Sequence, residues 1–249
     1  MKKLIQKIFN AFGYKIYKLN APTVVYKNNA KFTMQAAIKR CVTRGLKVNT
    51  IIDVGASDGR WSKACMNDIP NANYLLVEAQ QAHKNGLDKL KHEFLNVEYV
   101  IAAAGKENGT IYFDNSNLFG GLASETKLKT HCIEVPMISL DTEIQKRQLK
   151  PPYLLKLDTH GFEVPILEGA MELLKKAELV IIETYNYKLT DDSFKYFEMC
   201  NYMEQLGFSS IEMVDLMLRE HDNSFWQMDT FFIPSSSKMF LYNSYKSEA

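Results

Sequence analysis

Residues 49–59 read Asn-Thr-Ile-Ile-Asp-Val-Gly-Ala-Ser-Asp-Gly, an apolar run that leads into a segment with two glycines. A short apolar run bounded by polar and glycine residues is typical of a strand buried on both faces of a parallel sheet. Gly55 and Gly59 permit a tight turn after it and let a ligand approach the backbone closely. The stretch therefore predicts the first strand of an α/β sheet, followed by a ligand-binding turn.

From residue 48 onward the sequence alternates strand-like apolar runs with helical segments, which predicts a mostly parallel sheet covered by helices. Residues 106–150 interrupt this alternation with strand-like runs at 109–115 and 132–140 and a glycine-rich loop over 118–125. We expect helices over residues 57–68, 81–94, 164–176 and 191–206. We expect the main strands at residues 49–55, 73–79, 97–105, 153–158, 179–185, 210–216 and 226–234.

The chain divides into an N-terminal helical arm of residues 1–47, an α/β domain of residues 48–236 and a polar C-terminal tail of residues 237–249. Within the arm, residues 2–19 place apolar side chains at helical spacing with lysines between them, and a second helix is expected near 32–45. No apolar run approaches the roughly 18 residues that a membrane-spanning helix needs, and no signal-peptide cleavage site follows the arm. We therefore expect a cytoplasmic protein.

Charge is distributed unevenly along the chain. Residues 1–52 carry eleven of the 30 Lys and Arg residues and none of the 29 acidic residues. Such a basic arm predicts contact with an anionic surface, either membrane lipid at the inner face of the membrane, a charged glycan or nucleic acid. The alternative is that the arm packs on the acidic remainder of its own chain.

Cysteine and histidine spacing excludes several classes of protein. Cys41, Cys65, Cys132 and Cys200 form no Cys-x-x-Cys pair, and the five histidines show no metal-ligand spacing. This pattern argues against a zinc ribbon, a redox motif and a disulfide framework. We expect reduced, unpaired thiols.

An acid follows the second strand at the place where a nucleoside would be held. Glu78 lies 23 residues after Gly55, and a carboxylate there can accept hydrogen bonds from a ribose diol. A dinucleotide site would require Gly-x-Gly-x-x-Gly for close approach to a pyrophosphate, whereas this turn is Gly-x-x-x-Gly. S-adenosylmethionine has no phosphate, so the pair favours this cofactor and disfavours an NAD-type oxidoreductase.

Residues 154–170 read Leu-Leu-Lys-Leu-Asp-Thr-His-Gly-Phe-Glu-Val-Pro-Ile-Leu-Glu-Gly-Ala. Together with residues 53–59, this segment resembles the FkbM-type S-adenosylmethionine-dependent methyltransferase family. Ser139-Leu140-Asp141 and residues 227–232 are similar to further family segments, and the resemblance spans about residues 50–234. It implies a class I, Rossmann-like fold whose seven-stranded sheet has an antiparallel last strand. It also implies O-methylation of sugars, glycans or polyketide hydroxyls with S-adenosyl-L-methionine.

The strand ends and the resemblance together assign the cofactor site. Ligands of open α/β sheets bind at the carboxyl ends of the strands. The residues expected to bind the cofactor are Asp53, Gly55, Ala56, Ser57, Gly59, Trp61, Glu78, Ala79, Ala103 and Asp158.

Three residues near the end of the fourth strand are the candidates for catalysis. Asp158 is interpreted as a base, as an acceptor for the substrate hydroxyl or as a helix cap, and Glu163 as a helix-start acid or a substrate contact. His160 has a suitable pKa for proton removal but could instead stabilise the turn, and family members commonly carry Glu or Gln at this position. Asp158 with Glu183 could bind Mg²⁺, but a second carboxylate beside the first is missing, so we expect no metal.

Two loops are expected to form the acceptor pocket, because specificity usually resides in loops. One is the glycine-rich stretch of residues 115–124 and the other the polar loop of residues 216–228. Both could instead be solvated loops. The residues expected to bind the acceptor are Asn117, Ser124, Glu183, Arg219, His221 and Trp226.

The predicted function is O-methylation of a carbohydrate hydroxyl, in surface-polysaccharide assembly. A natural-product hydroxyl is the alternative acceptor. Residues 151–153, Pro-Pro-Tyr, are similar to a motif of amine and base methyltransferases, but here they precede the fourth strand instead of following it. They are interpreted as a turn, and a nucleic-acid methyltransferase is disfavoured.

Overall fold

A computed structural model of the protein describes residues 30–128, 131–242 and 244–245. The helix expected over residues 2–19 lies outside the described residues. Among the described helices, none has the length and apolar character required to cross a membrane.

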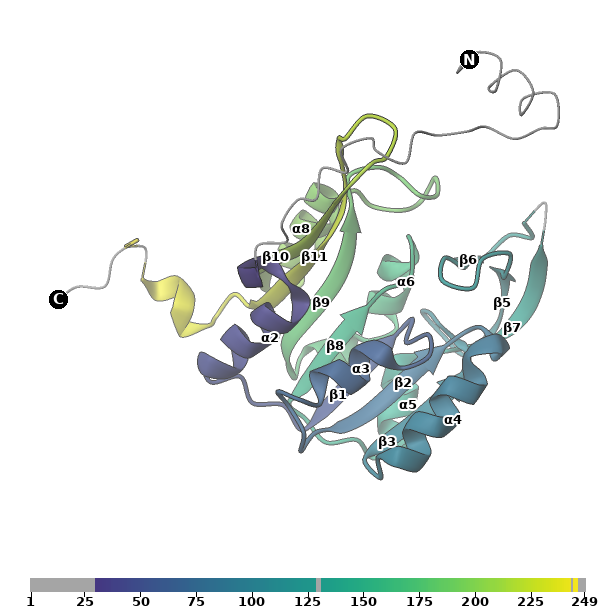
Figure 1. Cartoon of the computed structure of the whole chain (residues 1–249), viewed down its shortest axis with the longest axis horizontal. Helices are drawn as coiled ribbons and strands as arrows, with labels where there is room; N and C mark the ends of the chain where they lie inside the picture. Colours follow the sequence, from purple (N-terminus) through teal and green to yellow (C-terminus); the bar gives the residue numbers. More distant parts are fainter. Residues whose placement is uncertain (1–29, 129–130, 243, 246–249) are drawn as a thin grey trace, which may run out of the picture. The chain divides into compact units, whose positions relative to one another are not determined.

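Seven strands form the main sheet, in the order β10-β11-β9-β8-β1-β2-β3. Neighbouring strands are parallel except at β11, which runs antiparallel to both β9 and β10. This arrangement confirms the predicted class I methyltransferase topology (Figure 1). The strands are β1 (Thr50–Val54), β2 (Asn73–Glu78), β3 (Val97–Ile101), β8 (Tyr153–Leu157), β9 (Ala177–Tyr185), β10 (Phe208–Leu218) and β11 (Phe225–Pro234).

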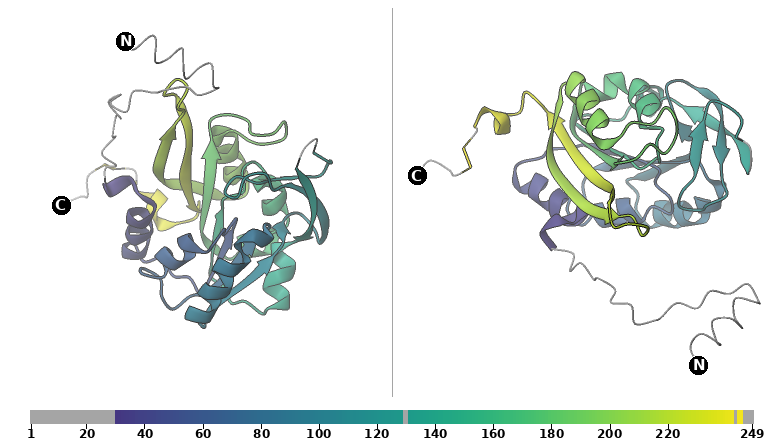
Figure 2. Two further views of the ribbon diagram at one scale, coloured as in Figure 1. Left: turned by 45° about the vertical axis from the view of Figure 1, so that its right-hand side comes forward. Right: turned by 90° about the horizontal axis from the view of Figure 1, so that it is seen from above.

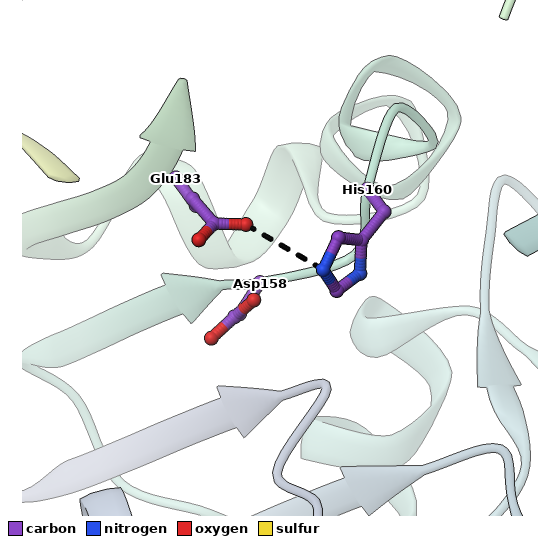
Figure 3. Close-up of side chains that lie close together, drawn as sticks. All are labelled: Asp158, His160 and Glu183. Carbon is purple, nitrogen blue, oxygen red and sulfur yellow. Dashed lines mark ion pairs between the residues drawn. The ribbon is translucent and has the colours of Figure 1, made fainter. Parts of the chain in front are cut away.

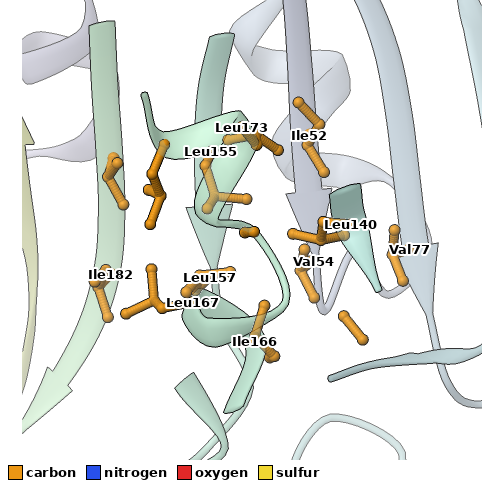
Figure 4. Packing of buried hydrophobic residues seen from close by; sticks show 14 of the residues in the cluster. Ile52, Val54, Val77, Leu140, Leu155, Leu157, Ile166, Leu167, Leu173 and Ile182 are labelled. Atoms are coloured by element: carbon orange, nitrogen blue, oxygen red, sulfur yellow. The ribbon is translucent and has the colours of Figure 1, made fainter. Parts of the chain in front are cut away.

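Helices cover both faces of the sheet because the central strands are apolar on both sides. Alternate residues of β1 divide between two buried clusters, with Ile52 and Val54 in one and Ile51 in the other. Figure 4 shows the first cluster, in which side chains of the helices pack on the strands. On its face lie α5 (Leu140–Lys146), α6 (Glu163–Glu168), α7 (Met171–Leu174) and α8 (Tyr196–Gln205). On the other lie α2 (Met34–Thr43), α3 (Arg60–Cys65) and α4 (Lys84–Glu93).

The single helix expected over residues 164–176 is two short helices, α6 and α7, divided at Gly169. A Cβ at Gly169 would lie 2.1 Å from the carbonyl oxygen of Gly105. The backbone of the break therefore packs directly against another segment of backbone, which only glycine permits.

The helix α2 belongs to the folded unit of residues 31–249, although the sequence places it in the arm. Its apolar face is buried against the sheet, with Ile38 and Cys41 at 1% and 4% exposure. Arg40 and Arg44 form ion pairs of 2.7 and 2.6 Å with Glu212 on β10. The boundary predicted at residue 47 is therefore wrong on the domain side, because the residues before it complete the core. After β11, the short 3-10 helix η3 (Lys238–Leu241) brings Phe240 onto this same cluster.

Residues 103–138 form a second, four-stranded sheet, which explains why the α/β alternation breaks there. Its order is β4-β7-β5-β6, and Figure 2 shows it beside the main sheet. The predicted glycine-rich stretch of residues 115–124 comprises the loop between β5 and β6 and the strand β6 itself. The strands are β4 (Ala103–Ala104), β5 (Gly109–Asp114), β6 (Leu122–Ser124) and β7 (Cys132–Ile138).

Candidate active site

A cavity of about 730 Å³ lies at the carboxyl ends of β1, β2, β8 and β9. Parallel strands all present these ends at one edge, which is where ligands bind in open α/β sheets. The loop between β5 and β6 and the first residues of α2 complete its walls. Of the predicted site residues, those that line the cavity are Gly55, Ala56, Ser57, Trp61, Glu78, Ala79, Ala103, Asp158, His160 and Glu183.

The turn after β1 leaves no room for a side chain at its first glycine. Gly55 has a φ of +75°, and a Cβ there would lie 1.9 Å from the carbonyl oxygen of Asp158. The turn therefore packs against the end of β8 and keeps its backbone open toward the cavity. Gly59, also predicted as a cofactor residue, begins α3 behind the turn and does not line the cavity.

Glu78 at the end of β2 links two segments of the cavity wall. Its carboxylate accepts hydrogen bonds from the backbone N–H of Ser57 at 2.7 Å and of Gln80 at 2.8 Å. Burial raises the pKa of Glu78, against these two hydrogen bonds. Its position at the cavity wall is the one expected for a ribose-binding acid.

The loop between β5 and β6 is fastened to the end of β2 by side chains that the sequence did not single out. Gln80 donates to the carbonyl oxygens of Asn117 and Leu118 at 3.0 Å each, and Nε2 of His83 lies 2.8 Å from the latter oxygen. Leu118 and Phe119 line the cavity beside Glu78. The side chains of Asn117 and Ser124, predicted to bind the acceptor, do not line the cavity. This loop thus borders the end of the cavity at which Glu78 is expected to bind the ribose of the cofactor.

Lys156 on β8 is a buried cation in the lining of the cavity. Its Nζ lies 3.0 Å from Oδ2 of Asp158 and 3.4 Å from Oδ1 of Asp53. Burial lowers the pKa of Lys156, but the two carboxylates outweigh burial and hold this pKa above its usual range. Asp53, predicted to bind the cofactor, lies below the cavity and accepts a 2.7 Å hydrogen bond from Ser62. Asp53 therefore reaches the cavity only indirectly, through its ion pair with Lys156.

Asp158, His160 and Glu183 converge from β8, the turn after it and β9 (Figure 3). One ligand atom of each lies within 4.8 Å of the others, and Nε2 of His160 is 3.8 Å from Oε2 of Glu183. Tyr185 and Gln227 both donate hydrogen bonds to the Glu183 carboxylate. Among the described residues, this is the group of His, Cys and acidic side chains close enough to share a cation. The sequence predicted that Asp158 and Glu183 lie close enough to consider a shared cation, and the fold adds His160 to this pair.

The three groups have different protonation states at neutral pH. Burial would raise the pKa of Asp158, but the Lys156 ammonium lowers it below its usual range. Burial lowers the pKa of His160, against the attraction of Asp158. Burial and the Asp158 charge raise the pKa of Glu183 to about 8. The cavity therefore holds an ionised aspartate, a neutral imidazole and a protonated glutamate in contact range.

The turn that carries His160 is strained and is held by Glu163. His160 and Gly161 have φ values of 55° and 101°, a region that side chains rarely occupy. The buried Glu163 carboxylate accepts hydrogen bonds from the backbone N–H of Gly161 at 2.8 Å and from Oγ1 of Thr159 at 3.1 Å. Because Glu163 does not line the cavity, its predicted catalytic role is replaced by positioning of this turn.

The other acceptor residues predicted from the sequence lie away from the cavity. Arg219 and His221 belong to the hairpin turn between β10 and β11, and Trp226 stacks on Tyr187 with ring centroids 5.6 Å apart. The guanidinium carbon of Arg219 lies over the same Tyr187 ring, 4.5 Å from its centroid. The two strands themselves reach the cavity instead, through Asp215, Met217, Gln227 and Asp229.

Comparison with known proteins identifies the family of the chain. Residues 53–210 match the Methyltransferase FkbM domain, which is more than half of the chain. The chain belongs to the FkbM methyltransferase family. The FkbM match begins at Asp53 and ends within β10, so it contains the turn after β1, Glu78 and the Asp158–His160–Glu183 group.

Solved structures of methyltransferases are similar in fold. Precorrin-6Y C5,15-methyltransferase from Geobacter metallireducens has 12% identity and a TM-score of 0.46, with 81% of this chain and 87% of that chain covered. A methyltransferase dependent on S-adenosylmethionine from Aquifex aeolicus has 15% identity and a TM-score of 0.41, with 79% and 89% covered. No curated protein matches the sequence.

The cofactor is S-adenosylmethionine, and the residues present fit it. The bare backbone at Gly55 offers the approach that the amino-acid portion requires, and Glu78 offers carboxylate oxygens to the ribose. Nε1 of Trp61, in the wall between them, is buried and has no hydrogen-bond partner among the described residues. A buried N–H without a partner is costly, so a bound acceptor atom would stabilise this wall.

Proposed function

We propose that this FkbM methyltransferase transfers the methyl group to a hydroxyl of a sugar or glycan. The observation that carries the proposal is the neutral His160 imidazole between the carboxyl groups of Asp158 and Glu183, on the cavity that holds the cofactor turn. A hydroxyl is a weak nucleophile that loses its proton as the new bond forms, so a positioned base accelerates this reaction.

S-adenosylmethionine would supply the methyl group from its sulfonium. The acceptor oxygen would bond to this methyl carbon as the carbon–sulfur bond breaks, S-adenosylhomocysteine would leave, and the hydroxyl proton would pass to His160. Asp158 is held as a carboxylate by Lys156, which makes it a weak base but a good partner for the imidazolium that forms. Of the alternatives left open for Asp158, stabilisation of the base is therefore the role that we propose.

A carbohydrate suits the polar end of the cavity. Carboxyl oxygens of Asp158, Glu183 and Asp229 and the Gln227 amide face the same space, and sugar hydroxyls can donate to all of them. A cavity of about 730 Å³ also lies within the range of small-molecule sites. We place the reaction in surface-polysaccharide assembly, with a natural-product hydroxyl as the second candidate.

The proposal is tested by intact-mass screening of sugars, nucleotide sugars and short glycans with the cofactor. We expect a product heavier by one methyl group and one equivalent of S-adenosylhomocysteine. The methylated atom is then located by fragmentation. Methyl transfer to a nitrogen or carbon atom would contradict the proposal. Methylation of a natural-product hydroxyl, with no methylated sugar among the products, would contradict a carbohydrate acceptor.

The basic arm is proposed to hold the enzyme at an anionic surface, membrane lipid or glycan. Support comes from sequence, since residues 1–29 contain six lysines and no acid. A polybasic segment contributes about 1 kcal/mol per charge near an anionic bilayer.

A further inference from the structure

We propose that the acceptor carries a protonated amine beside the methylated hydroxyl, so that the substrate class is an amino sugar. This inference rests on the proposed function and narrows it. It is carried by four carboxyl groups, Asp158, Glu183, Asp215 and Asp229, which line one end of the cavity and are called the acidic wall here.

Two members of the acidic wall oppose each other in the sheet. Asp229 on β11 is the direct register partner of Glu183 on β9. Directly opposed residues of antiparallel strands have Cβ atoms about 4.5–5.5 Å apart, and like charges at such positions destabilise the sheet. An arrangement that costs stability at the edge of a ligand cavity indicates a functional requirement for negative charge there.

Among the described residues, too few cations lie near the acidic wall to neutralise its four carboxyl groups if all were ionised. Asp229 has neither a hydrogen bond nor an ion pair from its side chain among the described residues, while Asp215 accepts one hydrogen bond of 2.9 Å from the N–H of Met34. Lys156 is the cation that faces the wall, and it is shared with Asp53 below. The other cation of the cavity, Arg60, pairs with Asp58 at the nucleoside side.

Two carboxyl groups of the acidic wall, Asp229 and Glu183, have raised pKa values and so retain their protons near neutral pH. Burial and the charges of Asp158 and Asp215 raise the pKa of Asp229 to about 7, against the attraction of Lys156. Glu183 responds in the same way, with a pKa of about 8. A bound ammonium would lower both values, because an opposite charge within a few ångströms favours the carboxylates. Binding of an amine should therefore release protons.

An organic ammonium fits the wall better than a divalent cation or an anion does. The acids come from β8, β9, β10 and β11 and surround a space larger than one ion, and Asp229 stands outside the group that could share a metal. A divalent ion bound to Asp158 would also lie next to the Lys156 ammonium, 3.0 Å from this carboxylate. An anionic group, such as a uronate or a phosphate, would be repelled by the whole wall.

The test is calorimetric binding of three sugars to the full chain saturated with S-adenosylhomocysteine at pH 7. The sugars are glucosamine, N-acetylglucosamine and glucose, which differ only in the charge and size of one substituent. We expect glucosamine to bind at least about tenfold tighter than the other two, equivalent to about 1.4 kcal/mol. Measurement in two buffers of different ionisation enthalpy should reveal net proton release for glucosamine only.

The variants are Asp229→Asn and the control Glu220→Gln, which removes one charge from the exposed hairpin turn of these strands. Asp229→Asn should abolish the preference for glucosamine and its proton release, whereas Glu220→Gln should keep both. Affinity for S-adenosylhomocysteine should be unchanged in each.

Several outcomes overturn the inference. These are equal binding of the three sugars, no binding of glucosamine, or a preference that survives Asp229→Asn. Tight binding of Mn²⁺ alone would make the wall a metal site. Weaker binding of S-adenosylmethionine but not of S-adenosylhomocysteine in Asp229→Asn, with the sugar preference intact, would assign the wall to the sulfonium. Failure of the proposed function is separate, since it would appear as a screen with no methylated hydroxyl.

Discussion

Lys156 donates to Asp158 across 3.0 Å at a point where both side chains approach the cavity floor. The pair decides which of the clustered groups is ionised before any ligand binds. With the ammonium in place, Asp158 keeps its charge and His160 stays the basic group of the cluster. Removal of the ammonium would leave Asp53 and Asp158 buried with no counter-charge.

Lys156→Met should therefore destabilise the protein by about 3–5 kcal/mol at pH 7, the usual cost of leaving a buried ion-pair partner alone. The loss should shrink at lower pH, where the carboxylates take up protons. Urea unfolding at several pH values measures both effects. The matched change Lys150→Met, at an exposed position, should leave stability unaltered, and equal effects at the two lysines would contradict the buried-pair account.

Glu78→Gln should weaken binding of S-adenosylhomocysteine at least about tenfold, since a hydrogen bond to a charged group contributes about 1.5–3 kcal/mol. The backbone N–H groups of Ser57 and Gln80 are held by different carboxylate oxygens, so the amide can keep only one of these two hydrogen bonds, and part of the lost affinity would come from the cavity wall itself. Thermal shift and calorimetry measure the change. Glu134→Gln, at an exposed position on β7, is the control. Unaltered affinity in Glu78→Gln would mean that the ribose is held elsewhere.

His160→Asn should lower the single-turnover rate of methyl transfer by about 10²–10⁴, the usual contribution of a general base. Affinity for the cofactor should change far less. His221→Asn, on the exposed hairpin turn, serves as the control. A near-parental rate for His160→Asn would remove the imidazole from the mechanism.

The pH dependence of this rate identifies the base. Only neutral imidazole accepts a proton, and the pKa of His160 is lowered by burial. The rate should therefore fall on the acid side with a pKa below about 6.5, the usual value of histidine. If Glu183 were the base, the fall would begin near its pKa of about 8 instead.

Asp229→Asn should stabilise the protein relative to the parent as pH rises toward about 7. A folded-state pKa of about 7 lies above the unfolded value, so the carboxyl group favours folding while protonated and loses this advantage as it ionises. The gain should be absent near pH 4, grow between about pH 4 and pH 7, and stay constant above that, with an upper limit of about 4 kcal/mol for a shift of about three pKa units. Unfolding curves of both proteins from pH 4 to 9 give the difference. A constant offset across this range would show that Asp229 does not titrate near neutrality.

Removal of residues 1–30 should abolish binding to anionic vesicles while cofactor binding persists. The cut is placed before Lys31 because α2 buries its apolar face in the core, so a cut near Val48 would unfold the domain. Co-sedimentation with vesicles at low and high salt measures binding, which should weaken as salt screens the lysines. Equal sedimentation of the two chains would leave the arm without a surface role.

Local patterns predicted the sheet, and they indicated Gly55 and Glu78, which line the cavity in the structure, because each of these signals lies within a short segment. The run before Gly55 and the acid at the end of β2 each carry their signal within a few residues. The end of the cavity that carries the acidic wall was predicted only in part, because it depends on the register between β9, β10 and β11. Glu183 was predicted from the sequence, whereas Gln227 and Asp229 were not. Glu183, Gln227 and Asp229 meet only once these strands pair. The hairpin residues Arg219 and His221 were chosen as loop residues, but both strands extend past the cavity and carry the turn beyond it.

The second helix of the arm was assigned to the wrong side of a boundary for a related reason. Charge counts along the chain grouped Arg40 and Arg44 with the lysines before them. In the fold these arginines neutralise Glu212, on a strand some 170 residues later. A composition shift marks a change in surface character, and here it does not coincide with the edge of the core.

The two tryptophans occupy different environments, and this gives the protein an internal optical probe. Trp61 lies in the cavity wall, with the Lys156 ammonium 5.3 Å from its ring and its indole N–H unpartnered. Trp226 is stacked on Tyr187, outside the cavity. Emission from the native protein therefore combines one fluorophore in the cavity wall with one outside the cavity that reports the packing of the β10–β11 hairpin on Tyr185 and Tyr187.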